Sequence, residues 1–416
     1  MEEWKEYKYT DLCTLIGGGT PKTSEPSYWG GDIPWLSVKD FGNDEKYVYS
    51  TEKTITEAGL NNSSTKLLRR DDIIISARGT IGAIAMLASE MAFNQSCFGI
   101  RSNDIVEQHY LYYLTKTKIS ELQKNSHGSV FDTITRDTFA KIDCVIPSKK
   151  IQRQIASILS SLDDKIEANR KINENLEQEA QALFKSWFVD FEPFKNGEFV
   201  ESELGMIPKG WRVEKIGNLP INVTDYVANG SFASLKENVK LYQTPEYAYF
   251  IRNTDLKSGN YEVYVDKHSY EFLSKSTLYG GEVIISNVGD VGSVHLCPYL
   301  DKPMTLGNNI IMLKPDKQYY SFFLYILFKW AYGNDLIMSI KGGSAQPKFN
   351  KTDFKSLKII VPNDVVLEKY HSIISSLFNK IRVLDDESRR LAELRDTLLP
   401  KLMSGELKVN EIEGNL

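Results

Sequence analysis

A glycine-rich loop near the N-terminus is the first segment whose residue types could bind a phosphate group. Residues 17–23 read GGGTPKT, with Lys22 after three glycines. A phosphate-binding loop of the P-loop type needs a glycine directly before its lysine and a buried strand upstream. Here Pro21 precedes the lysine and no buried strand comes before the loop. The pattern therefore argues against nucleotide binding at this loop.

Other residues with catalytic potential are scattered along the chain. The five histidines are all more than ten positions apart, so they form no zinc motif at ligand spacing. The sequence has neither a Gly-x-Ser-x-Gly elbow nor the Asn-Pro-Pro-aromatic or Asp-Pro-Pro-aromatic tetrapeptide of amino-methyltransferases. The four cysteines match no zinc, redox or disulfide spacing and are predicted to be small buried hydrophobes. These observations predict a protein that binds rather than catalyses, without a metal of its own.

Length and composition describe an ordinary globular chain. It has 416 residues, 42% of them hydrophobic and 25% charged, which suits two or three domains. The longest apolar run, residues 322–328, is too short for a membrane span, and the acidic start is unlike a signal peptide. We expect a cytoplasmic protein with no membrane contact. The net charge of −5 is unusual for a nucleic-acid binder taken as a whole.

The sequence contains an internal repeat. Residues 72–82, DIIISARGTIG, align without gaps on residues 282–292, EVIISNVGDVG, at an offset of 210. At an offset of 215, Pro147 corresponds to Pro362, and the serine- and isoleucine-containing segments 157–166 and 372–381 correspond. Two half-chains of about equal size therefore share one plan.

Each half ends in a long helical pattern. Apolar positions from Ile151 to Trp187 advance 36 residues in ten steps, which is the helical period. A matching stripe runs from Val366 to Leu402, and Ser148 and Asn363 are suitable N-caps. Each helix would be roughly 56 Å long. A helix packed along its own domain is the simpler interpretation of one such stripe, but two equal stripes favour an antiparallel pair.

Polar residues interrupt both stripes, and a proline lies near the end of the second. Asn169 in the first helix, and Ser388 and Arg395 in the second, are predicted to fix the register of the pair. Pro400 is predicted to end or kink the second helix near Leu399.

The globular parts mix strands and helices. Strands are predicted at 71–76, 282–286 and 309–313, and aromatic-rich core helices at 108–119 and 319–330. The predicted fold class is α+β, with two mixed α/β domains, two long antiparallel coiled-coil helices and an internal pseudo-twofold repeat. The predicted boundaries are a first domain at 1–148, a helix at 149–190, a linker at 191–210, a second domain at 211–362, a helix at 363–403 and a tail at 404–416.

Several segments together carry a family resemblance. They are residues 18–22, 28–40, 72–82, 152–166 and 398–405, in this order and partly in duplicate. The chain resembles, over nearly its whole length, the specificity subunit of type I restriction-modification systems. The second half departs from the first because residues 223–249 lack the Gly-Gly-Thr-Pro loop. That difference fits two domains that read different half-sites.

The resemblance implies two target recognition domains that bind double-stranded DNA. It also implies that the two helices dock modification (methyltransferase) subunits, two copies being expected, along a seam that we assign to Ile155, Leu162, Ile166, Tyr370, Leu377 and Ile381. Restriction subunits would complete the complex. S-adenosylmethionine, ATP and Mg would then be bound by the partner subunits, and this chain would be non-catalytic.

Candidate DNA contacts follow from loop position. Half-sites held some 50 to 60 Å apart would span about one and a half turns of B-DNA, with an unread spacer between them. Side chains of Arg, Lys, Asn, Gln, Ser and Thr read base edges or hold phosphates. The candidates are Thr20, Lys22, Ser37, Lys39 and Arg78 in the first half, and Arg252, Asn253, Asn287, Lys341, Ser344, Gln346 and Lys348 in the second. Any one of them could equally be a solvated loop residue.

Two other functions fit parts of the sequence. A duplicated coiled-coil scaffold whose heads bind proteins or glycans is compatible with the composition and charge. A fused methyltransferase-specificity enzyme is opposed by the missing catalytic tetrapeptide. The acidic balance further predicts that tight DNA binding needs the modification subunits, because counterion release scales with the number of phosphates neutralised.

Overall fold

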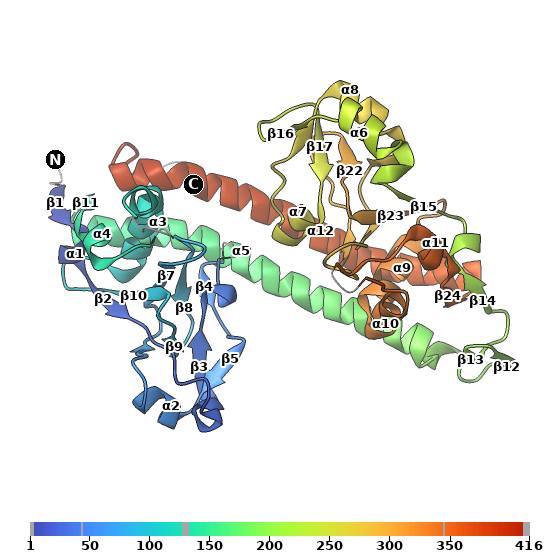
Figure 1. Cartoon of the computed structure of the whole chain (residues 1–416), viewed down its shortest axis with the longest axis horizontal. Coiled ribbons are helices and arrows are strands. Elements are labelled where there is room, and N and C mark those ends of the chain that lie inside the picture. The colour runs from blue at the N-terminus through green and yellow to red at the C-terminus, as the bar shows by residue number, and fades with distance from the viewer. Residues whose placement is uncertain (1–3, 43–44, 127–132, 344–345, 411–416) are drawn as a thin grey trace. The chain divides into compact units, whose positions relative to one another are not determined.

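The computed structural model describes residues 4–42, 45–126, 133–343 and 346–410. The chain forms two compact units (Figure 1). Unit 1 comprises Met1–Lys171 with Leu384–Leu416, and unit 2 comprises Ile172–Val383. Ser344 lies outside the described residues.

Unit 1 consists of three antiparallel or mixed sheets and short helices. Its larger sheets have the strand orders β2-β10-β7-β8-β4 and β5-β3-β9-β6, and β1 pairs with β11. The strands are β1 Lys5–Lys8, β2 Cys13–Gly17, β3 Trp29–Leu36, β4 Tyr47–Val48, β5 Lys53–Ile55, β6 Leu67–Leu68, β7 Ile73–Ser76, β8 Ile84–Leu87, β9 Met91–Phe93, β10 Cys97–Ser102 and β11 Asp143–Ile146. The helices are α1 Tyr9–Leu12, α2 Glu57–Asn61, α3 Gln108–Lys124 and α4 Arg136–Ala140.

Unit 2 repeats this plan with additions. Its larger sheets have the orders β15-β23-β20-β21 and β16-β18-β17-β22-β19, while β12 pairs with β13 and β14 with β24. The strands are β12 Phe199–Ser202, β13 Gly205–Pro208, β14 Arg212–Lys215, β15 Ile221–Asp225, β16 Leu241–Tyr242, β17 Ala248–Ile251, β18 Tyr264–Val265, β19 Thr277–Leu278, β20 Val283–Ser286, β21 Val294–Leu296, β22 Met304–Leu306, β23 Ile310–Pro315 and β24 Lys358–Val361. The helices are α6 Phe232–Asn238, α7 Asn253–Ser258, α8 Lys267–Phe272, α9 Tyr319–Lys329, α10 Ala331–Ser339 and α11 Lys351–Ser356.

The repeat extends to individual strand pairs. The order β2-β10-β7-β8 corresponds to β15-β23-β20-β21, and β5-β3-β9-β6 corresponds to β18-β17-β22-β19. In both units one pair inside the second sheet is parallel, β3 with β9 and β17 with β22. The α+β class and the predicted central strands are confirmed, because β7, β20 and β23 begin within two residues of the predicted positions.

Two long helices complete both units. Helix α5 runs over Lys149–Phe184 and helix α12 over Asp364–Ser404. Within unit 1 they run in opposite directions, since Asp163 meets Arg395 while Asn169 meets Ser388. Within unit 2, Asn173 donates to the carbonyl of Ile381 at 3.4 Å. The prediction of two long helices that pack together is confirmed.

At its N-terminus α12 follows the prediction, whereas near its C-terminus one of the two effects predicted for Pro400, an end of the helix, does not occur. The Asn363 side chain accepts a hydrogen bond from the Val366 N–H at 3.0 Å, as expected of an N-cap. Pro400, however, does not end α12, which continues to Ser404. The last turn packs Leu402 and Met403 into the core of unit 1, and this burial favours continuation past the proline.

Each unit has its own apolar core. In unit 1 the tyrosines of α3 pack with Ile155 of α5 and Leu402 of α12. In unit 2 the aromatic side chains of α9 pack with Phe184 and Tyr370. The two aromatic-rich helices are therefore core helices, as predicted, and all four cysteines are buried and free. In the part of the chain that is described, no helix is long and apolar enough to cross a membrane.

Candidate nucleic-acid interface

In unit 1, loops that are far apart in sequence meet around one turn, residues 94–96. The Asn94 N–H donates to the carbonyl of Leu36 at the end of β3, and the Ala77 N–H donates to the carbonyl of Ser96 at 2.8 Å. The Thr20 hydroxyl donates to the side chain of Gln95. The loops after β2, β3, β7 and β9 therefore share one edge, which we call the first loop edge. The candidates Thr20, Lys22, Ser37, Lys39 and Arg78 all belong to these loops.

The glycines of the N-terminal loop permit this close packing. A Cβ on Gly18 would lie 2.1 Å from the carbonyl oxygen of Asn94, and one on Gly19 would lie 2.2 Å from the Ser64 hydroxyl. The Trp35 indole N–H donates to the Gly19 carbonyl at 3.1 Å and holds the loop from the other side. The glycines thus serve close backbone approach, a role that does not require a bound phosphate.

The candidate side chains of unit 1 differ in availability. Ser37 is engaged, because its N–H and hydroxyl both donate to Asp40, at 2.7 and 2.8 Å. The side chains of Lys22, Lys39 and Arg78 are exposed. The three cations are therefore the available contacts of the first loop edge, and Ser37 shapes its loop.

Unit 2 builds a second loop edge with the same backbone frame. The Gly307 N–H donates to the carbonyl of Ile251 at 2.7 Å, and the Asn287 N–H donates to the carbonyl of Asn309 at 3.1 Å. These bonds match the two around Asn94 and Ala77 in unit 1. The second loop edge thus comprises the loops after β17, β20 and β22.

Two of the candidates at the second loop edge are held by carboxylates. The Arg252 guanidinium donates to both oxygens of Asp255, which raises the pKa of Arg252. The Asn253 amide donates to Asp290 at 3.1 Å, and Lys257 pairs with the same carboxylate at 2.6 Å. The hydrogen bond from Lys257 lowers the pKa of Asp290.

Lys341, Gln346 and Lys348 lie in the described segments 341–343 and 346–349, beside Asn287. Gly342 and Lys348 exchange backbone hydrogen bonds, and the Gly289 N–H donates to the carbonyl of Pro347 at 2.9 Å. The Asn287 amide donates to the carbonyl of Phe349 at 3.3 Å, so it helps to fix segment 346–349. Lys341, Gln346 and Lys348 are exposed. The structure thus brings these candidates together next to the loop after β20.

A partly buried histidine lies close to the second loop edge. His295 on β21 is within 3.0 Å of the Ser293 hydroxyl. Burial, reinforced by the nearby charges of Lys329 and Lys257, lowers the pKa of His295 to about 4. It is therefore neutral at pH 7 and adds no positive charge to the second loop edge.

The sequence-based choice of candidates missed two residues that hold candidate side chains in place. Gln95 holds Thr20, and Asp290 holds Asn253 and Lys257. For Gln95 the sequence did contain a signal. Amide-rich turns follow β9 at Asn94 and Gln95 and follow β22 at Asn308 and Asn309, so the two halves share this feature. Among the described residues, no cluster of three or more His, Cys, Asp or Glu side chains could hold a metal.

Two of the six residues predicted to form the docking seam are buried inside their own units. Ile155 and Tyr370 are buried in the cores of their own units, so neither is open to a partner. The periodic pattern could not separate the side of a helix that faces its own domain from the side that faces a partner. Leu162, Ile166, Leu377 and Ile381 are partly buried.

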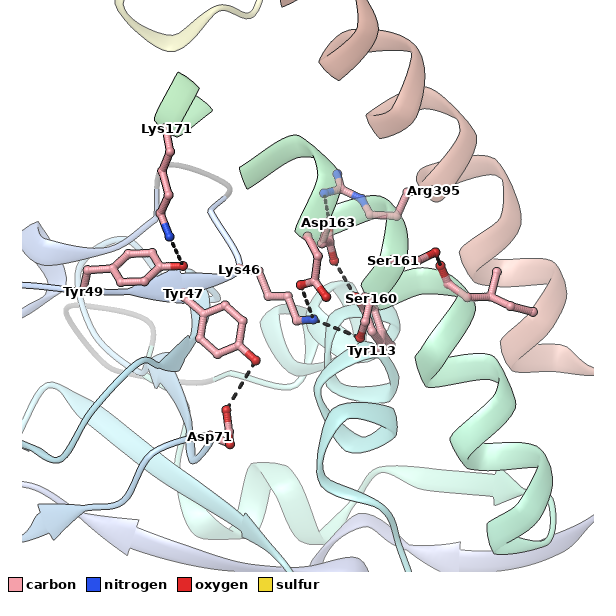
Figure 2. Close-up of polar contacts among 12 residues, drawn as sticks. Lys46, Tyr47, Tyr49, Asp71, Tyr113, Ser160, Ser161, Asp163, Lys171 and Arg395 are labelled. Atoms are coloured by element: carbon pink, nitrogen blue, oxygen red, sulfur yellow. Dashed lines mark hydrogen bonds and ion pairs between the residues drawn. The ribbon is translucent and has the colours of Figure 1, made fainter. Parts of the chain in front are cut away.

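A buried polar junction fixes the sheets of unit 1 to the long helices (Figure 2). Arg395 of α12 donates to Asp163 of α5 at 2.8 Å, with side chains 4% and 5% exposed. The Tyr113 hydroxyl of α3 donates to the same carboxylate. Lys46, which directly precedes β4, donates to Ser160 at 2.9 Å, and burial lowers its pKa. Asp163 and Ser160 of α5 thus bind side chains from α12, from α3 and from the residue before β4, so the junction positions the domain on the helix pair.

Comparisons with known proteins agree on one family. A family model described as the Type I restriction modification DNA specificity domain matches residues 1–178 and 189–393. The Type I restriction enzyme MjaIX specificity subunit of Methanocaldococcus jannaschii is 35% identical over 432 residues, which cover 99% of this chain and 95% of the relative. The HindI specificity subunit of Haemophilus influenzae is 25% identical over 476 residues, covering 98% and 100%. The crystal structure of an S subunit from M. genitalium has a similar fold, with a TM-score of 0.52, 17% identity and 96% of each chain covered.

Proposed function

The chain belongs to the DNA specificity subunits of type I restriction-modification systems, and we propose from this that each unit reads one half of a bipartite DNA site with its own loop edge. As a member of that family, it is a non-catalytic subunit. Methyl transfer from S-adenosylmethionine, and cleavage with ATP and Mg, would take place on modification and restriction subunits. A cytoplasmic location follows from that role.

The main observation behind the proposal is that the two loop edges share the same backbone hydrogen bonds but have different side chains. The hydrogen bonds of Asn94 and Ala77 recur at Gly307 and Asn287. On this shared frame, unit 1 presents Lys39 and Arg78, whereas unit 2 presents the Asn253–Asp290 pair. Major-groove edges are distinguished by such patterns of donors and acceptors, so different side chains on one frame would read different half-sites.

We assign separate tasks to the candidate residues. Thr20 and Ser37 in unit 1, and Arg252 and Asn287 in unit 2, would keep the loops in place, since each is bonded within its unit. The exposed cations Lys22, Lys39, Arg78, Lys341 and Lys348 would contact phosphates or bases, together with Gln346. Phosphate contacts position a protein on DNA, whereas base contacts specify the sequence.

For the modification subunits we propose the outward surface of the helix pair. Ile172 of α5 and Ile373 of α12 are each about 40% exposed, and Val383 is 53% exposed. Single exposed apolar side chains are common on proteins, but they are less common on long paired helices, whose outer faces are normally polar. The partly buried residues Leu377 and Ile381 of unit 2 would border this surface, and Leu162 and Ile166 are proposed as contacts on the part of α5 that belongs to unit 1.

A binding experiment separates DNA reading from the scaffold function. The chain is co-purified with its modification subunit, and binding to genomic DNA fragments is compared for the wild type and the Lys22→Ala, Arg78→Ala and Lys348→Ala variants. Lys209→Ala is the control, because that lysine pairs with Glu198 on the β12–β13 hairpin. The proposal expects weaker binding in each variant and no change in the control. Unchanged binding in all variants would favour the scaffold.

A further inference from the structure

A polar pocket lies in unit 2 between the edge of one sheet and the edge of the other. Its volume is about 270 Å³, and its lining includes Asn222 and Thr224 of β15, Lys314 of β23, and Lys275, Thr277 and Tyr279 at and around β19. Neither the family comparisons nor the candidate contacts above assign a role to it. We call it the β15–β19 pocket.

Strand register explains why these side chains face one space. Asn222 lies opposite Lys314, and Thr224 lies opposite Met312, in the β15–β23 pair. Residues two apart on a strand point to the same face, so all four side chains line one side of the pocket. The Lys275 N–H donates to the side chain of Asn229, which holds the turn before β19 in place.

The pocket is electropositive although the chain is acidic. No carboxylate is among its lining residues. Of the nearby acids, Glu282 accepts from the Tyr279 and Gly280 N–H groups, and Asp225 pairs with Lys351 at 2.8 Å. Within the described residues, neither Lys275 nor Lys314 has a carboxylate at ion-pair distance. The Lys314 ammonium instead lies 4.1 Å from the centroid of the Tyr279 ring, which holds the charge beside the pocket without neutralising it.

The corresponding place in unit 1 is built differently. Arg101 lies opposite Thr14 in the β10–β2 pair, as Lys314 lies opposite Asn222. Arg101 is bound by Asp72, to which it donates two hydrogen bonds. In unit 1 the cation is therefore neutralised by a buried carboxylate, whereas in unit 2 the equivalent cation is available.

One side of the pocket lies close to the second loop edge. Thr277 pairs with Thr305 on β22, and the chain reaches Gly307 of the second loop edge two residues later, roughly 7 Å along the strand. Lys314 lies farther away, five residues along β23 from Asn309, which is roughly 17 Å. A group bound in the pocket would thus lie within about half a turn of B-DNA from the bases that the second loop edge would read.

We propose that the β15–β19 pocket binds a phosphate group of the DNA backbone next to the second half-site, an inference that rests on the proposed function. Lys275 and Lys314 donate to the phosphate oxygens, and the Thr224 hydroxyl and the Asn222 amide supply further donors. Lysine, hydroxyl and amide donors are the usual partners of DNA phosphates. The contact sets the position of unit 2 on the duplex and carries no sequence information itself.

The test measures how DNA binding depends on salt. The chain with its modification subunit is titrated onto a duplex carrying its methylation motif, between 50 and 300 mM salt, for the wild type, Lys275→Ala with Lys314→Ala, and the Lys209→Ala control. Loss of one phosphate contact makes the slope of log K against log salt less negative by about 0.9 and weakens binding roughly fivefold at 0.15 M salt. The motif that is methylated stays the same in the double variant. Thermal melting of each protein checks that the pocket variants fold.

The outcomes are distinguishable. If the wild type binds and the double variant keeps its slope, the pocket holds no DNA phosphate and the inference fails, although the proposed function stands. If the wild type itself shows no binding to duplex DNA, the proposed function fails. Titration with inorganic phosphate, monitored by the NMR signals of the lysine side chains, tests whether the pocket binds free phosphate instead of a DNA phosphate. If the double variant loses binding of inorganic phosphate but the salt dependence of DNA binding is unchanged, the pocket binds a small free anion and not a DNA phosphate.

Discussion

Removal of the Arg395 side chain should selectively destabilise the junction of unit 1. The guanidinium is 4% exposed, and it donates at 2.8 Å both to Asp163 and to Asp396. Burial alone would lower the pKa of Arg395, but these hydrogen bonds raise the pKa above its ordinary value. In Arg395→Ala the buried Asp163 carboxylate keeps the Tyr113 hydroxyl but loses the guanidinium that pairs with it. Breaking a buried pair in this way costs about 3–5 kcal/mol.

The internal repeat supplies a matched replacement for the whole pair. At the offset of 215, Asp163 corresponds to Phe378 and Arg395 to Ala180, so unit 2 uses an apolar pair at the same place. The double variant Asp163→Phe with Arg395→Ala therefore copies unit 2. Replacing a buried ion pair by apolar residues is often close to neutral, and here Tyr113 also loses its acceptor, which costs about 1–3 kcal/mol. We expect the double variant to be less destabilised than Arg395→Ala alone.

Hydrogen exchange measures this effect within unit 1. Amides of residues 155–170 and 388–399 should exchange at least a hundredfold faster in Arg395→Ala, which corresponds to about 3 kcal/mol, while those of residues 173–184 should change little. Lys8→Ala is the control, because its pair with Asp143 is exposed and worth under about 1 kcal/mol. If the losses in Asp163→Phe and Arg395→Ala simply added in the double variant, the two side chains would not be coupled and the reasoning would be refuted.

Three further predictions concern other parts of the chain. His295 stays neutral in the folded state down to about pH 4 but takes up a proton near pH 6.5 when unfolded, so the free energy of unfolding should fall by roughly 3 kcal/mol from pH 6.5 to 4. Urea unfolding across this pH range should show the loss, and in His295→Gln the pH dependence should be weaker. Gly18→Ala should displace the turn at Asn94, because the added Cβ would meet its carbonyl at 2.1 Å; methylation mapping should show one half of the motif relaxed, and an unchanged motif would contradict the assignment of this loop. The isolated chain, with a net charge of −5, should bind its duplex far more weakly than the complex does; nanomolar binding by the chain alone in physiological salt, measured by fluorescence anisotropy, would refute this.

Local patterns in the sequence were sufficient to predict the main elements. Apolar runs bounded by glycine turns predicted β7 and β20, and the helical period predicted α5 and α12, because burial on one side imposes these spacings. Internal similarity predicted the duplicated plan without any structural knowledge. Of the two effects predicted for Pro400, an end or a kink of α12, the end does not occur, since tertiary burial of Leu402 and Met403 favours continuation of the helix.

The detailed organisation of the candidate site could not be predicted in this way. The first loop edge depends on the parallel pairing of β3 with β9, which brings together segments more than fifty residues apart. No local pattern shows that Thr20 meets Gln95, or that Arg252 is bound by Asp255 rather than free for a ligand. Ile155 was assigned to a docking seam because it lies on the apolar stripe, but that part of the stripe covers the core of unit 1.

The most direct test of the central claim is a map of methylated bases with the two units treated separately. The chain and its modification subunit are co-expressed in a methylation-free host, and modified adenines are located by single-molecule sequencing. We expect a bipartite motif with a fixed unread gap, in which Lys39→Ala with Arg78→Ala alters only one half and Asn253→Ala with Asp290→Ala alters only the other. A stable complex that methylates no motif, or variants of one unit that change both halves alike, would contradict the account.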